Sequence, residues 1–325
     1  MSATAPETVS GSAEALTGKA PGRTRPRTPT RRRGPRGRAH RRRPGRSTAL
    51  TVAMGLMLAY TLIPLLWLAI SATKSNQTLF DSPGLWFGDG FHLFDNVRDV
   101  FTYDHGIYLR WFGNTLLYSV VGAGGASVFA TMGGYALAKF EFAGRRVLSA
   151  LVIGAISIPA SALAVPTYLL FSDMGIVNTP WAVLLPSLAS PFGLYLMRVY
   201  ATEALPDAML EAARIDGAGE LRIFLTIAMR LLAPGFVTVL LFTLVATWNN
   251  YFLPLIVLND PDLFPLTVGL RQWDSLAQGG AGAGAIPILP LVITGSLLAI
   301  IPLIVAFLFL QRFWQSGLAA GGVKQ

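Results

Sequence analysis

Residues 211–218 read Glu-Ala-Ala-Arg-Ile-Asp-Gly-Ala and form a short polar island between two long apolar segments. Just before them, Pro206 and Asp207 suit the first turn of a helix. Proline lacks a backbone N–H, but an N–H in the first turn has no hydrogen-bond partner within the helix, so nothing is lost. The carboxylate of Asp207 meets the positive end of the helix dipole. Gly217 is expected to end this helix, because glycine tolerates the left-handed backbone that follows many helices. A second amphipathic run follows and is expected to stop at Pro234. The sequence therefore predicts two short helices joined by a sharp turn.

The first predicted helix carries alanines, whose small side chains would let the backbone of another protein approach closely. Spacing alone leaves two interpretations open. The helix docks in a groove of a partner protein, or it lies at a surface, joins two membrane spans and binds nothing. Short motifs often mislead, so the wider pattern has to decide between them.

The pattern Glu-Ala-Ala, three residues, Gly, nine residues, Ile-x-Met, which begins at Glu211, resembles the EAA signature of permeases of binding-protein-dependent ABC transporters. In that family this loop, here about residues 199–234, is the coupling helix gripped by a cytoplasmic ATPase. The resemblance implies ATPase-coupling roles for Glu211, Ala212, Ala213, Asp216, Gly217 and Ala218. The fuller form EAARIDGA resembles the carbohydrate-uptake, MalG-like branch. Arg230 stands where the family usually has proline, which affects the bend after the second helix.

The composition indicates an integral membrane protein. Of the 325 residues, 53% are hydrophobic and only 13% are charged, about half the charged fraction of a typical soluble domain. Cysteine is absent, which excludes disulfides and thiolate ligands. The three histidines, His40, His92 and His105, share no ligand-like spacing, so we expect no metal site.

Residues 1–47 are predicted to be a disordered, basic cytoplasmic tail. They hold thirteen of the 26 lysines and arginines and few large apolar residues, so they cannot offset the entropy of ordering. The arginine runs at 31–33 and 41–43 are compatible with nucleic-acid binding or with contact to anionic lipid. Because an apolar span follows at once, we favour anionic lipid and expect no nucleic acid.

Residues 48–325 are predicted to be an all-α permease domain with six transmembrane helices. Six apolar segments approach the ~20 residues needed to cross hydrocarbon; they are 48–70, 113–137, 147–171, 180–197, 235–258 and 289–310. None contains a charged residue or a histidine. Ionisable groups within membranes usually mark proton or ion relays, so their absence argues against a secondary carrier. The family resemblance implies the MetI-like fold of ABC importer permeases.

The distribution of lysine and arginine predicts the orientation. Twenty-two lie on the side of both termini and of the 199–234 loop, and four lie on the other side. By the positive-inside rule, the termini and the loop face the cytoplasm of a bacterial cell whose plasma membrane holds the protein. The aromatic-rich outer loop at 71–112 is expected to form short helices on the membrane surface.

Other segments extend the resemblance over roughly residues 50–325. Phe142-Ala-Gly-Arg-Arg before the third span resembles the family's phenylalanine–glycine–arginine turn, and Trp248-Asn249 in the fifth resembles its Trp-Asn pair. The third span contains Pro159, which is expected to bend its helix. The glycine-rich end of the chain also resembles that of the family.

No catalytic constellation is apparent. The chain has no GxxxxGK[ST] phosphate-binding loop and no Ser–His–Asp set, so it is not expected to be an enzyme. The rival hypothesis, a membrane enzyme or scaffold anchored by six spans, would need clustered polar catalytic residues, which we do not find. The chain itself is expected to bind no cofactor, and ATP-Mg would be bound by a separate ATPase.

The candidate substrate pathway rests on polar groups within the spans. Asn249 and Asn250 lie in an apolar segment, where an unpaired amide is costly, so they should face other helices or a wet cavity. A hydrogen bond between helices is one interpretation. Contact with a sugar is the other, with Trp248 and Tyr168 as neighbours, because aromatic faces and amides suit hydroxyl-rich ligands.

The resemblance also implies a set of partners. They are a second, homologous MalF-like permease subunit, two cytoplasmic ABC ATPases, an extracytoplasmic solute-binding protein and a carbohydrate. Closure of the ATPases would push the coupling helices and turn the pore from inward-facing to outward-facing.

Overall fold

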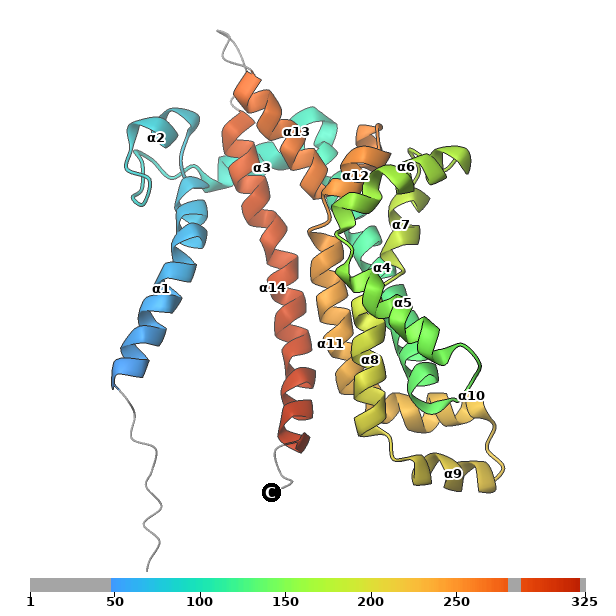
Figure 1. Ribbon diagram of the computed structural model, residues 1–325. Coiled ribbons are helices and arrows are strands. Elements are labelled where there is room, and N and C mark those ends of the chain that lie inside the picture. Colours follow the sequence, from blue (N-terminus) through green and yellow to red (C-terminus); the bar gives the residue numbers. More distant parts are fainter. Residues whose placement is uncertain (1–47, 280–287, 322–325) are drawn as a thin grey trace, which may run out of the picture. The chain divides into compact units, whose positions relative to one another are not determined.

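The computed structural model describes residues 48–279 and 288–321, which are helical and contain no strand (Figure 1). The predicted tail at 1–47, residues 280–287 and residues 322–325 lie outside the described residues. The chain divides into two compact units, Met1–Met54 and Gly55–Gln325. Described residues of the first unit are the exposed beginning of one helix, and the second unit holds the remaining helices and both apolar clusters.

Fourteen α-helices occur in the described residues: α1 (Thr48–Ser71), α2 (Asn76–Asp81), α3 (Leu93–Thr102), α4 (Ile107–Lys139), α5 (Arg145–Ser157), α6 (Ala164–Asp173), α7 (Trp181–Ser187), α8 (Pro191–Ala204), α9 (Asp207–Ile215), α10 (Glu220–Ile223), α11 (Met229–Trp248), α12 (Phe252–Val257), α13 (Leu266–Gly279) and α14 (Ile288–Gly321). Short 3₁₀ turns lie at Tyr103–Gly106, Ala160–Leu163 and Pro261–Leu263, and a π-helical turn at Phe224–Ala228 joins α10 to α11. The short helices expected in the outer loop at 71–112 are present as α2 and α3.

Five helical stretches of the described chain are long and apolar enough to cross a membrane: Thr48–Ser71, Leu93–Lys139, Trp181–Ala204, Glu220–Trp248 and Ile288–Gln311. The predicted spans 48–70, 113–137 and 289–310 lie within three of them, and 180–197 matches Trp181–Ala204 except for its first residue. The fifth predicted span, 235–258, is too long: its helix ends at Trp248, and the separate short helix α12 follows. The third predicted span, 147–171, is broken into α5 and α6, which are bent by 100° to each other.

Pro159 explains this break. A proline pushes the residue before it out of the helical region, and Ile158 takes an extended conformation with φ −85° and ψ 123°. The bend expected at this proline is therefore present, and it is sharp enough to divide the span into two helices.

The 33-residue helix α4 is the central element of the second unit, in contact with α8 and α11 along its length (Figure 1). Small residues allow this close packing. A Cβ added at Gly134 would lie 2.7 Å from the backbone nitrogen of Arg198, and one added at Gly122 would lie 2.7 Å from the Cβ of Ser187. Glycine at these two positions therefore lets α8 and α7 approach the backbone of α4 closely.

Two apolar clusters hold the unit together. The aromatic cluster surrounds Trp111 and Trp273, whose ring centroids are 4.9 Å apart, and includes Tyr108. The α9 cluster lies at the other end of α4 and includes Met197, Leu205, Leu210, Ile223 and Leu232. In Figure 1, α3 and α13 lie at the end with the aromatic cluster, and α9 and α10 lie at the opposite end.

Candidate functional site

The helix predicted over the Glu-Ala-Ala segment is α9, and it ends where the sequence predicts. Gly217 has φ +80°, and its N–H donates to the carbonyl of Arg214 at 3.0 Å. The Ala218 N–H donates to the Ala213 carbonyl, also at 3.0 Å, which completes a glycine-type helix end. The predicted pair of helices is therefore confirmed as α9 and α10.

The second predicted helix does not stop at Pro234, so that expectation is wrong. Residues Glu220–Trp248 form one continuous helical stretch, and Pro234 lies inside α11. The proline removes one backbone hydrogen bond, which spanning helices tolerate when their neighbours cover the freed groups. Arg230, where the family usually has proline, is an exposed residue of this helix. The second helix of the loop is thus joined directly to a spanning helix.

The six predicted coupling residues divide between the two faces of α9 and its turn. Four are exposed: Glu211, Ala212, Asp216 and Gly217. Ala213 is buried and Ala218 is half-buried; both belong to the α9 cluster or pack against it. The structure thus gives the exposed members a surface that another protein can reach, and gives Ala213 a packing role.

Exposed apolar side chains extend this surface. Ile215 is 85% exposed, Leu221 of α10 is 70% exposed and Met209 is 42% exposed. Ile215 and Leu221 are not among the residues predicted for the site. The only signal for Ile215 is an isoleucine inside an otherwise polar segment, and spacing does not tell which face of a nine-residue helix is buried.

A buried lysine attaches α9 to the end of α4. The side chain of Lys139, the last residue of α4, is only 5% exposed. Its Nζ donates to the carbonyl of Leu205 at 2.6 Å and to Oδ1 of Asp207 at 2.7 Å. The hydrogen bond from Lys139, together with its positive charge, lowers the pKa of Asp207. The sequence contains no signal for this contact, because it joins residues far apart in the chain.

A second ion pair spans the turn between α9 and α10. Arg214 Nε lies 2.6 Å from Oε1 of Glu220, so the two short helices are tied across Gly217. Leu210 of α9 is buried in the α9 cluster, and Phe224 packs on Tyr135 with ring centroids 5.2 Å apart. Residues of α9 therefore belong to one packed cluster with residues of α4, α8 and α11.

The predicted pathway residues lie where α11 ends and α12 begins. Trp248 is buried and donates from Nε1 to the Ala299 carbonyl of α14 at 3.2 Å. Asn249 is exposed, and its amide donates to the Val245 carbonyl one turn earlier in its own helix at 2.8 Å. Asn250 is half-buried, and its backbone carbonyl accepts a hydrogen bond from the hydroxyl of Thr267.

Tyr168 of α6 packs against the aromatic cluster, of which Trp248 is also a member. The structure therefore places these two aromatic residues in the same cluster. The two asparagines lie beside it at the helix break.

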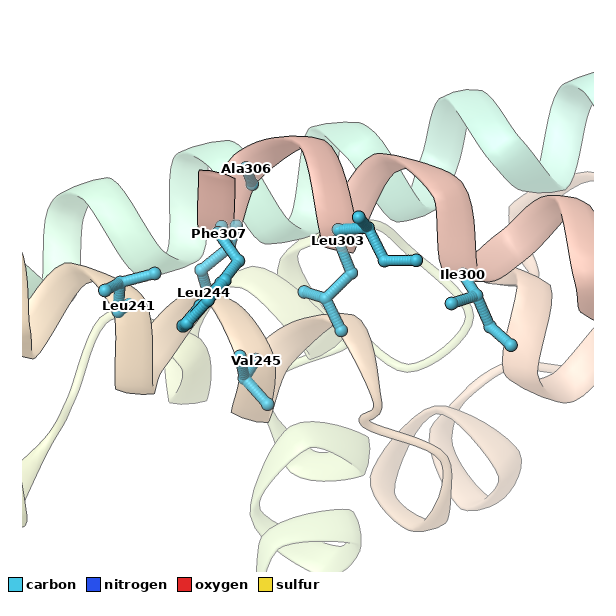
Figure 2. A pocket seen from close by; sticks show the side chains of 8 residues that line it. Leu241, Leu244, Val245, Ile300, Leu303, Ala306 and Phe307 are labelled. Carbon is cyan, nitrogen blue, oxygen red and sulfur yellow. The ribbon is translucent and has the colours of Figure 1, made fainter. Parts of the chain in front are cut away.

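An apolar cavity of about 260 Å³ lies between α11 and α14 and is lined by residues that precede the break in sequence and by residues of α14 (Figure 2). Its lining residues are Leu241, Leu244, Val245, Ile300, Leu303, Ile304, Ala306 and Phe307. These side chains carry no polar atom that could orient the hydroxyls of a sugar. Among the described residues, no three His, Asp or Glu side chains gather in a way that could hold a metal ion.

Comparison with known proteins decides the family. Residues 45–315 match the family described as "Binding-protein-dependent transport system inner membrane component". The chain belongs to this family. The permease is therefore a multi-pass membrane component of a transport system, and it is not an enzyme.

Curated relatives cover nearly the whole permease. It is 33% identical over 279 residues to the arabinooligosaccharides transport system permease protein AraQ of Halalkalibacterium halodurans, which covers 86% of the permease and 96% of the relative. It is 31% identical over 275 residues to the maltodextrin transport system permease protein MdxG of Bacillus subtilis, covering 83% and 93%.

A solved structure has the same fold. It is a chain of a bacterial ABC transporter involved in the import of the acidic polysaccharide alginate, with a TM-score of 0.70 and 23% identity. The match covers 82% of the permease and 95% of that chain. The permease thus has the fold predicted for ABC importer permeases.

Proposed function

We propose that the permease imports a carbohydrate, delivered by an extracytoplasmic binding protein, as one transmembrane subunit of an ATP-driven complex. The observation that carries this proposal is the near full-length similarity to permeases named for arabinooligosaccharides and maltodextrin. Relatives named for lactose and for melibiose, raffinose and stachyose agree with a sugar or oligosaccharide substrate.

The proposed complex contains a second, MalF-like permease subunit and two cytoplasmic ABC ATPases that bind ATP-Mg. The exposed surface of α9 supports an ATPase contact, because four predicted coupling residues and Ile215 are free of contacts that would bury them. In this proposal Glu211, Ala212, Asp216 and Gly217 face the ATPase. Ala213 and Ala218 hold α9 to the permease.

Coupling would follow from the attachments of α9. A push on α9 by closing ATPases reaches α4 through Lys139 and Asp207, and reaches α8 and α11 through Leu210 and its neighbours. In this proposal the packed helices have two discrete arrangements, one with an inward-facing pore and one with an outward-facing pore. This subunit supplies the movement, and the ATPases supply the free energy.

The proposed orientation places both termini and α9 in the cytoplasm, as the lysine and arginine distribution requires. The basic residues 1–47 would lie against anionic lipid of the bacterial plasma membrane. Asn249 and Asn250 are the proposed polar contacts of the sugar pathway. Trp248 and Tyr168 would support them from the apolar side, since the Trp248 N–H is already bonded to α14.

Uptake measurements test the proposal. Cells lacking the permease should lose accumulation of one radiolabelled sugar or oligosaccharide from a panel, and the wild-type gene should restore it. The panel should include arabinooligosaccharides, maltodextrin, lactose, raffinose and sn-glycerol 3-phosphate, because one relative is named for the last solute. Loss of glycerol phosphate uptake alone would contradict a carbohydrate substrate.

A further inference from the structure

Three arginines from two helices line one cavity at the end of the permease that carries α9. Arg145 and Arg146 begin α5, and Arg198 lies on the neighbouring helix α8. The cavity has a volume of about 430 Å³. Its lining residues are Arg145, Arg146, Ser149, Ala150, Ile153 and Arg198.

One of these arginines has a structural partner. The Arg145 guanidinium donates to the carbonyls of Leu137 at 2.8 Å and Ala138 at 3.2 Å, near the C-terminus of α4. Such carbonyls commonly receive basic side chains, so Arg145 is held in a fixed position. It fixes the first turn of α5 beside α4, and the next residue, Arg146, also lines the cavity.

The other two arginines have no acidic partner among residues 48–279 and 288–321. Lys139, Arg214 and Arg271 each pair with an acidic side chain. Neither Arg146 nor Arg198 has an acidic group within 4.0 Å in the part of the chain that the structure describes. Two positive charges that share a cavity repel each other, and an anion between them removes this repulsion.

One acidic residue lies close by and has to be considered. Glu141 lines an adjacent cavity of about 400 Å³, which also contacts Arg145 and Arg146. Glu141 does not line the cavity that contains Arg198. An anion is therefore favoured on the Arg198 side of Arg146, away from the carboxylate.

One side of the cavity is apolar and exposed. Ala150 and Ile153 follow the arginines along α5, and the neighbouring Val147 and Leu151 are each 64% exposed. A free inorganic anion would use only the arginines. A molecule with a phosphate and a hydrocarbon chain would use both the arginines and the apolar wall.

We propose that this cavity binds an anionic phospholipid, with its phosphate between Arg146 and Arg198 and an acyl chain along Ala150 and Ile153. Arginine suits phosphate because its planar fork of donors matches phosphate oxygens. Basic pockets between membrane helices are suited to anionic headgroups. The lipid would bridge α5 and α8 next to α9. The site requires membrane insertion but not sugar transport, so its failure would leave the proposed function standing.

Native mass spectrometry of the purified full-length permease tests this site. Phosphatidylglycerol and phosphatidylcholine would be titrated separately, and bound lipid would be counted. The double variant Arg146→Gln, Arg198→Gln should bind phosphatidylglycerol roughly 30-fold more weakly, from a loss of about fivefold per arginine. Its weak binding of phosphatidylcholine should not change.

A matched control removes the same charge elsewhere at this end. Arg222 and Arg230 are both exposed and have no acidic partner among the described residues. The double variant Arg222→Gln, Arg230→Gln should keep phosphatidylglycerol affinity within about twofold. An equal loss in both double variants would show a general surface potential and overturn the proposal.

Two further variants separate a lipid from a free phosphate and from misfolding. Ala150→Phe fills the apolar wall and keeps every charge, so it should weaken phosphatidylglycerol binding as well. Arg146→Lys with Arg198→Lys keeps both charges but loses the planar forks, so its affinity should lie between those of the wild type and the glutamine double variant. If inorganic phosphate displaced phosphatidylglycerol at equal concentration, or if Ala150→Phe bound it normally, the site would be one for phosphate alone and the lipid would be excluded.

Discussion

At the scale of single residues, the turn after α9 depends on backbone conformation and not on space. Gly217 has φ +80°, yet a Cβ added there would meet nothing within 4 Å. A side chain at positive φ costs roughly 1–2 kcal/mol, and more when it is β-branched. The hydrogen bonds that end α9 therefore require glycine at this position.

We predict that Gly217→Val lowers sugar uptake about tenfold or more while the amount of permease in the membrane stays normal. Gly219 is a matched control, because a Cβ there also meets nothing within 4 Å but its φ is −69°. Gly219→Ala should transport normally. Uptake assays with quantitative immunoblots of membranes measure both, and normal uptake by Gly217→Val would contradict a role for this turn.

Lys139 is the second residue whose substitution tests the proposed coupling, because its side chain attaches α9 to α4. Lys139→Met keeps most of the apolar part of the side chain but removes both donated hydrogen bonds; the one to the carbonyl of buried Leu205 is worth about 1.5–3 kcal/mol because its donor is charged. We expect ATP hydrolysis by the assembled complex to continue while sugar uptake falls several-fold. Lys139→Arg should restore much of the uptake; equal loss of both activities in Lys139→Met would indicate simple unfolding.

The same contact has a defined pH dependence. Because Lys139 lowers the pKa of Asp207, the ionised carboxylate is favoured in the folded protein. The contribution of this ion pair to the free energy of unfolding is fully present above the ordinary pKa of aspartate, near 3.9. It is lost as the pH falls through the lower pKa that Asp207 has in the folded protein. The thermal melting temperature of the permease should therefore show no step from this pair between about pH 5 and 8.

At the scale of elements, α9 is a short helix that is attached on one face and exposed on the other. Ile215 is 85% exposed and so contributes nothing to packing within the permease. We predict that Ile215→Lys abolishes co-purification of the ATPase and sugar uptake but leaves the melting temperature of the isolated permease unchanged. Thr202→Lys, at an exposed position of α8 outside α9, is the control and should retain the ATPase.

The contact of α13 with α4 depends on the absence of a side chain at Gly269, whereas the proposed ATPase contact of α9 depends on the presence of one at Ile215. A Cβ at Gly269 would lie 2.2 Å from the ring of Trp111. Gly269→Ala should destabilise the permease by about 1–3 kcal/mol, since overpacking forces the ring to move. Gly279→Ala, where a Cβ meets nothing within 4 Å, should melt normally in the same detergent.

At the scale of the whole molecule, topology is directly testable because the chain has no cysteine. Gly279→Cys and Gly219→Cys both place a thiol in open space, at opposite ends of the helical unit. An impermeant thiol reagent added to intact cells should label the first variant and not the second. The opposite pattern of labelling would invert the proposed orientation.

Much of the fold follows from the sequence because hydropathy alone detects a segment that must lie in hydrocarbon. The turn at Gly217 was also predictable, since it depends on the backbone of one residue. The exposure of Ile215 and the burial of Lys139 were not, because both depend on which face of α9 meets helices distant in the chain. The 100° bend between α5 and α6 shows a similar limit: the sequence indicates a bend at Pro159 but not its size.

The length of α4 has a mechanical consequence. Its 33 residues reach from the aromatic cluster near Trp111 to Lys139, which at about 1.5 Å per residue is about 50 Å. A rigid rod of that length works as a lever: a tilt of about 5° about one end moves the other by about 4 Å, nearly one helical turn. A small rotation of α4 about its Lys139 end, imposed there by α9, would therefore move the opposite end, where Trp111 and Trp273 meet, by the larger distance.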